Sequence, residues 1–210
     1  MMQSSRKIGI LLLLLAIPIF LVLFLQFFST SHYDIPVYYE NGIDSLTQCE
    51  SSTEVHRVAP FQASDVITGE NQTINFENQI RVVYWHSDDC QDTCRLVLEE
   101  LARLQGVFES QTALQLLFVS ESPLQDAPTL ANTYRKQLPE WLFLQGTEGQ
   151  SSSFVQCELI LPQPELPLNA TLMLVDDEAR IRGYYLGTSS KDVDRLIGEI
   201  RILLYNMNTN

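Results

Sequence analysis

An apolar run from Ile8 to Phe28 is the feature that most restricts how this chain folds, because it contains no charged residue. About 20 apolar residues suffice for a helix to cross the hydrocarbon core of a bilayer. A cleaved signal peptide is the alternative, but its apolar region usually has only about 7–15 residues. The sequence therefore predicts an uncleaved transmembrane anchor at 8–28, preceded by a short cytoplasmic N-terminus at 1–7.

The charges around this run predict its orientation. Arg6 and Lys7 precede it, and the next Lys or Arg in the chain is Arg57. Because positive flanking residues stay in the cytoplasm, we expect the globular part on the periplasmic or external side of the cell membrane. Disulfides form and persist in that compartment. The formal net charge of −13 argues against nucleic-acid binding, which needs a basic surface.

Strand and helix patterns alternate after a predicted tether at 29–60, which is rich in Ser and Thr and has little periodicity. A globular domain is expected at 61–207. The predicted strands are 79–85, 114–119, 141–144, 171–175 and 181–186, and the predicted helices are about 97–108, 129–137 and 189–206. Ser189 and Asp192 are placed to cap the last helix. This order predicts an α/β fold of thioredoxin-like layout, with a central sheet and helices on both faces.

Two cysteines, Cys90 and Cys94, follow the strand predicted at 79–85. A helix that begins there favours a thiolate, whereas the neighbouring acids Asp88, Asp89 and Asp92 disfavour one. At positions i and i+4 the two sulfurs can form a disulfide or share a soft metal ion such as Cu(I) or Zn(II). A bridge across so short a loop adds little stability, which favours a redox or metal role over a structural one.

Several further motifs follow the cysteine pair in a fixed order. They are PLQDAP with Leu130 and Tyr134 (123–134), WLFLQG (141–146), LVD (174–176) and IRGYYLGT (181–188), and the tether contributes YDIPVYYENG (33–42). With the C-x3-C pair, they make the chain from about Tyr33 to Tyr205 resemble the Sco/SenC family. These are membrane-tethered, thioredoxin-like proteins that help to assemble the copper centre of cytochrome c oxidase.

The resemblance implies a thiol–disulfide redox protein or a copper chaperone. Cys90 would be the attacking or metal-facing thiol and Cys94 its partner. The implied protein partner is the copper-site subunit of cytochrome c oxidase, or another envelope thiol protein. The family also binds copper through a histidine just before the strand at 171–175, where Asn169 stands in this chain. An amide is a poor ligand for a soft ion, so the chain departs from the family at this point.

Two alternatives follow from this departure. His86 is a candidate nitrogen donor, because a turn could bring it back towards the cysteines, although it could also merely end a strand. The other alternative is a non-catalytic accessory protein that kept the fold, lost the copper site and binds a partner.

The remaining cysteines, Cys49 and Cys157, are far apart in the sequence. A bridge between them would close a loop of more than about 100 residues, which is worth up to about 4–5 kcal/mol in the chain-entropy model. We hypothesise this bridge, which would clamp the tether to the domain. The alternative is two unpaired, buried cysteines.

Overall fold

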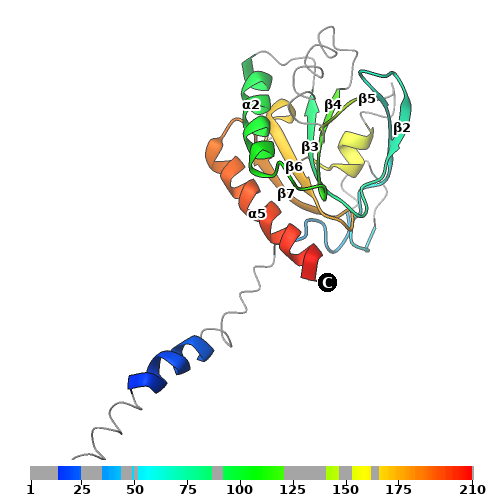
Figure 1. Ribbon diagram of the computed structural model, residues 1–210. Helices are drawn as coiled ribbons and strands as arrows, with labels where there is room; N and C mark the ends of the chain where they lie inside the picture. The colour runs from blue at the N-terminus through cyan, green and yellow to red at the C-terminus, as the bar shows by residue number, and fades with distance from the viewer. Residues whose placement is uncertain are drawn as a thin grey trace, which may run out of the picture. The chain divides into compact units, whose positions relative to one another are not determined.

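Two compact units make up the computed structural model, Met1–Asp34 and Ile35–Asn210. In the first unit, residues 14–24 are helical (Figure 1). No helix among the described residues is long and apolar enough to cross a membrane. The predicted span 8–28 extends beyond them at both ends, so the anchor stays a prediction. The structure describes residues 14–24, 35–43, 49, 52–86, 92–120, 141–146, 153–161 and 166–209.

The second unit contains a seven-stranded mixed sheet with the strand order β2-β1-β5-β4-β3-β6-β7 (Figure 1). The three neighbouring strands β3, β4 and β5 run parallel, and all the other pairs are antiparallel. The strands are β1 Phe61–Asp65, β2 Asn71–Ile74, β3 Ile80–His86, β4 Leu114–Ser120, β5 Trp141–Gly146, β6 Thr171–Val175 and β7 Ile181–Leu186. The mixed sheet fits the α/β, thioredoxin-like fold predicted from the sequence.

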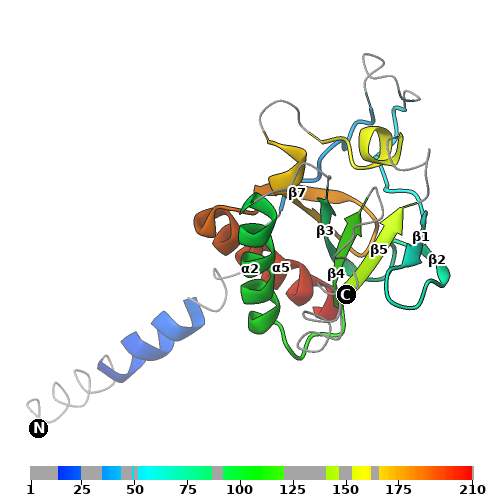
Figure 2. The same ribbon diagram turned by 90° about the horizontal axis from the view of Figure 1, so that it is seen from above.

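Two long helices, α2 (Asp92–Val107) and α5 (Ser190–Thr209), lie side by side on one face of the sheet (Figures 1 and 2). Their apolar faces pack on alternate residues of the central strands, such as Val82 and Tyr84 of β3. Asp192 donates its backbone N–H to the hydroxyl of Ser189 at 3.4 Å, so the predicted cap of α5 is present.

The opposite face of the sheet packs on a second apolar cluster. Here Val83 and Trp85 of β3 meet Phe61 of β1 and Phe154 of η1, a short π-helix at Phe154–Glu158. Among the described residues both long helices therefore share one face, although helices were expected on both. The predicted helix at 129–137 lies outside the described residues.

The described part of the predicted tether, from Ile35 onward, packs onto the domain. The compact unit begins at Ile35, whose side chain is 5% exposed. Tyr38 donates its backbone N–H to the carbonyl of Ile181 at 2.9 Å. A disulfide joins Cys49 to Cys157 with a Cα–Cα distance of 5.4 Å, which is the pairing hypothesised from the sequence.

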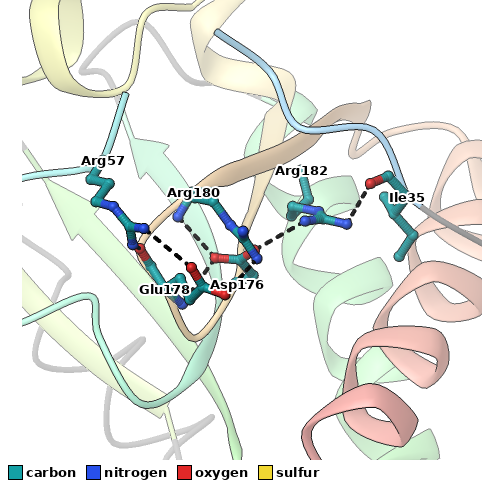
Figure 3. Close-up of polar contacts among 6 residues, drawn as sticks. All are labelled: Ile35, Arg57, Asp176, Glu178, Arg180 and Arg182. Atoms are coloured by element: carbon teal, nitrogen blue, oxygen red, sulfur yellow. Dashed lines mark hydrogen bonds and ion pairs between the residues drawn. The ribbon is translucent and has the colours of Figure 1, made fainter. Parts of the chain in front are cut away.

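A buried ion cluster fixes this N-terminal segment to the β6–β7 hairpin (Figure 3). The carboxylate of Asp176 is fully buried and accepts from Arg180 Nε at 2.8 Å and Arg182 Nη1 at 3.2 Å. Arg182 also donates to the carbonyl of Ile35. At the rim, Arg57 pairs with Glu178 at 3.1 Å. The turn between β6 and β7 therefore also holds the preceding chain in place.

Candidate functional site

The end of β3 and the first turn of α2 bring three polar side chains together. Cys94 Sγ lies 2.8 Å from the hydroxyl oxygen of Tyr84 and 3.2 Å from Nδ1 of His86. Tyr84 and His86 are two residues apart on one strand, so their side chains project to the same face of the sheet. That face is the one covered by α2, where Cys94 belongs to the apolar stripe of the helix. The amphipathic packing of α2 therefore places the sulfur above the end of β3.

The three side chains of the site are buried. Cys94 and His86 are each 6% exposed, and Tyr84 is fully buried. The ring of Phe118 on β4 lies beside both β3 side chains, with centroid distances of 5.2 Å to His86 and 5.5 Å to Tyr84. Burial raises the pKa of the Tyr84 hydroxyl well above its usual range, so this group stays protonated at neutral pH.

Cys94 is disulfide-bonded. Its predicted partner Cys90 lies outside the described residues, as do Asp88 and Asp89. Asp92 begins α2 and is exposed. Of the two predicted redox cysteines, Cys94 therefore lies among the described residues and Cys90 does not.

Asn169 lies next to the same group of side chains. It belongs to η2, a single 3-10 turn at Leu168–Ala170 that leads into β6. The backbone carbonyl oxygen of Asn169 accepts a hydrogen bond from the Tyr84 hydroxyl at 3.0 Å. The backbone at the position of the expected family histidine is therefore linked to Cys94 through Tyr84.

Tyr84 is the site residue that the sequence analysis missed. It stands inside an apolar run, within the strand predicted at 79–85. A usable signal was present, because Tyr84 and His86 alternate with Trp85 and so must share one face of the strand.

At this site the described residues bring together one sulfur and one imidazole nitrogen as possible metal donors. No group of three His, Cys, Asp or Glu side chains that could hold a metal occurs among the described residues. Typical metal–sulfur and metal–nitrogen bonds at a tetrahedral angle separate the two donor atoms by roughly 3.5 Å. The observed 3.2 Å between Cys94 Sγ and His86 Nδ1 is within a few tenths of an ångström of that value. Once the disulfide is reduced, small adjustments would let both atoms bind one ion.

The other disulfide lines a separate hollow of about 390 Å³, whose wall includes Phe61, Phe154, Cys157 and Glu158. These aromatic residues belong to the cluster on the sheet face opposite α2. The hollow is therefore not part of the Cys94 site.

Comparison with known proteins gives a consistent fold assignment. No family model and no curated protein matches the sequence. The fold matches a SCO1/SenC family lipoprotein from Bacillus anthracis str. Ames, with a TM-score of 0.58 and 16% identity over 71% of this chain and 95% of that chain. It also matches BsSco, a member of the Sco family of cytochrome c oxidase assembly proteins, with a TM-score of 0.54 and 17% identity over 70% and 92% of the two chains.

Yeast Sco1 is a third match, with a TM-score of 0.51 and 20% identity over 69% of this chain and 98% of that chain. It has also been solved with copper bound, and that structure matches with a TM-score of 0.50. The chain therefore has the thioredoxin-like fold of the Sco/SenC proteins, as the sequence resemblance predicted. At these identities the shared property is the fold, so the function is argued from the site.

Proposed function

We propose that this chain is a Sco-type thiol–disulfide protein that acts through Cys90 and Cys94 in assembly of the copper centre of cytochrome c oxidase. The observation that carries the proposal is the Cys94 sulfur, which is disulfide-bonded and held in the first turn of α2 against two polar side chains of β3. Since Cys49 bonds to Cys157, we assign Cys90 as the other half of the bridge.

In the reducing direction, the Cys90 thiolate attacks one sulfur of a disulfide in the partner protein. The partner's S–S bond breaks, and its electron pair stays on the second partner sulfur. Cys94 then attacks Cys90, which closes the Cys90–Cys94 bridge and releases the first partner sulfur as a thiolate. Two electrons pass from the pair to the partner, and no metal is needed. The target would be a cysteine pair such as that of an oxidase copper site.

Copper enters the proposal as cargo. Two thiolates from Cys90 and Cys94 suit Cu(I). For Cu(II), His86 Nδ1 would be the nitrogen donor, because it already lies 3.2 Å from Cys94 Sγ. In this arrangement His86 would replace the histidine that the family carries near position 169. The amide of Asn169 would not be a ligand.

We also propose that residues 8–28 anchor the protein in the cell membrane, with the domain on the external side. The helical residues 14–24 support this, because their apolar side chains are exposed, among them Leu14 at 64% and Phe20 at 70%. Such a surface is suited to lipid.

A trapping experiment tests the thiol chemistry in the full-length protein, kept in detergent because of its apolar N-terminal run. Reduced Cys94→Ala should form a stable mixed disulfide between Cys90 and a peptide that carries a disulfide, because the resolving thiol is gone. The Cys90→Ala protein is the matched control and should form little adduct, since Cys94 is buried. Equal trapping by both proteins, or by neither, would contradict the proposed roles.

A copper titration tests whether the protein binds copper. It also distinguishes the proposed function from a second candidate, an accessory protein without a copper site. The reduced wild type should bind Cu(I), and His86→Ala should weaken Cu(II) binding more than Cu(I) binding. An accessory protein without a copper site is favoured by Asn169 at the position of the family histidine. That candidate predicts no binding of either ion and no trapped adduct.

A further inference from the structure

The hydroxyl group of Tyr84 touches two other groups of the site. It lies 2.8 Å from Cys94 Sγ and 3.0 Å from the carbonyl oxygen of Asn169. A carbonyl oxygen can only accept, so the single hydroxyl hydrogen is directed to Asn169. The lone pairs of the hydroxyl oxygen then remain for a donor, and Cys94 Sγ is within reach of them.

A disulfide sulfur and a thiol differ in what they offer to that oxygen. The disulfide sulfur has no hydrogen to donate, whereas the thiol formed by reduction has one. A thiolate at the same place would accept the hydroxyl hydrogen instead. In either protonation state, reduced Cys94 gains a hydrogen bond that the oxidised form makes only weakly.

We propose that Tyr84 is a positioning residue that favours the reduced state of the cysteine pair by hydrogen bonding to Cys94 Sγ. This inference rests on the proposed thiol–disulfide function. In the reaction concerned, an external dithiol reduces the Cys90–Cys94 bridge and is itself oxidised to a disulfide. Cys94 keeps the electron pair of the broken S–S bond and takes up a proton to become a thiol. The hydrogen of this thiol then points to the hydroxyl oxygen of Tyr84.

The surroundings of Tyr84 hold this geometry in place. Its ring lies on the central strand β3 and is fully buried in the cluster beneath α2. Its hydroxyl connects α2 to the turn before β6, so that in the reduced protein a hydrogen-bond chain would run from the Cys94 thiol through the hydroxyl to the backbone carbonyl of Asn169. Consecutive hydrogen bonds polarise one another and are strengthened in a buried site.

The test compares reduction potentials in the full-length protein, equilibrated in detergent with reduced and oxidised glutathione. Tyr84→Phe removes the hydroxyl and keeps the ring. It should shift the equilibrium towards the disulfide by about two- to tenfold, which is the range of one hydrogen bond. Tenfold corresponds to about 30 mV for a two-electron couple, so the potential becomes more negative by up to about that amount.

Tyr184→Phe is the matched control. Tyr184 is also buried and its hydroxyl donates to a backbone carbonyl, that of Leu159, at 2.7 Å. It lies in the cluster on the opposite face of the sheet. This variant loses a comparable hydrogen bond and should leave the potential unchanged. An unchanged or less negative potential in Tyr84→Phe, or an equal shift in both variants, would overturn the inference.

A second measurement does not depend on how well Tyr84→Phe folds. In reduced protein held acidic enough to protonate the thiols, the S–H stretching band of Cys94 is assigned by its loss in Cys94→Ser. The proposed hydrogen bond lowers this frequency relative to an exposed thiol in His86→Ala as well as in the wild type, since His86 Nδ1 at 3.2 Å is a second acceptor for the same hydrogen. A band at the exposed-thiol position in either protein would overturn the inference. If the wild-type pair does not exchange with glutathione at all, the proposed function fails, while the S–H band still decides on the Tyr84 contact.

Discussion

Removal of the Cys49–Cys157 disulfide offers a quantitative test of how the N-terminal segment is held. The bridge joins residues 108 positions apart. For a loop of that length the chain-entropy relation gives about 16 cal/mol/K, or about 4.8 kcal/mol at 25 °C. A bridge across the C-x3-C loop gives only about 2 kcal/mol by the same relation. The two disulfides should therefore differ clearly in their effect on stability.

The folded state should survive the loss of this bridge, because other contacts hold the same segment. Tyr39 donates its hydroxyl to the carbonyl of Ile160 at 3.0 Å, and the His56 ring nitrogen lies 2.7 Å from the carbonyl of Glu158. The change then falls mainly on the unfolded chain. We expect Cys49→Ser/Cys157→Ser to lower the free energy of unfolding by about 3–5 kcal/mol.

Urea unfolding followed by tryptophan fluorescence measures this difference, since Trp85 and Trp141 are both buried in the domain. Cys90→Ala/Cys94→Ala is the matched control, and it should lower the free energy of unfolding by less. A loss below about 1 kcal/mol for the long-range pair, or a larger loss for the control, would refute the view that this bridge staples the tether to the domain.

Three further substitutions test other parts of the account. Asp176→Asn removes the carboxylate that pairs with buried Arg182 and should lower the free energy of unfolding by about 3–5 kcal/mol in chemical denaturation. Arg81 is 7% exposed, no carboxylate contacts it among the described residues, and burial lowers its pKa to about 10. Its folded state therefore binds the proton less well than the unfolded chain, so the unfavourable contribution of the Arg81 charge should diminish between about pH 10 and 12. Buried Tyr84 and Tyr185, whose pKa values are raised, lower the stability of wild type and Arg81→Met alike in this range, so the Arg81 effect is measured as a narrowing difference between the two proteins. Arg81→Met should stabilise the protein at neutral pH by about 1–3 kcal/mol, and a destabilised variant would contradict this. Asn169→His should raise Cu(II) affinity at least about tenfold in a competition titration, because imidazole is the better ligand, and unchanged affinity would show that this position does not reach the metal.

Much of the central sheet could be predicted from sequence because its strands are apolar and bounded by turns. The structure has β6 and β7 at the predicted residues, and β3 is displaced by one residue. The hairpin of β1 and β2 was missed. Its strands read FQASD and NQTI, with too few apolar residues for a periodic signal, and its turn depends on Asp65 accepting two backbone N–H groups.

Most residues of the candidate site could be identified from the sequence, whereas the contacts between them could not. Cys94 and His86 were both identified from the sequence, but their 3.2 Å approach depends on how α2 packs over β3. Tyr84 was missed because an aromatic residue in an apolar strand is usually core. The Cys49–Cys157 pairing joins segments whose proximity only the folded chain creates. Cys90 and the motif at 123–134 lie outside the described residues, so their roles stay predictions.

The reduction potential of the Cys90–Cys94 pair tests the central claim most directly. Full-length protein would be equilibrated across a series of glutathione ratios, quenched by alkylation, and the peptide containing both cysteines quantified by mass spectrometry. A thiol–disulfide exchange protein should show one two-electron transition between about −270 and −180 mV, the range of thioredoxin and protein disulfide isomerase. A potential below about −300 mV, typical of structural disulfides, would contradict the account.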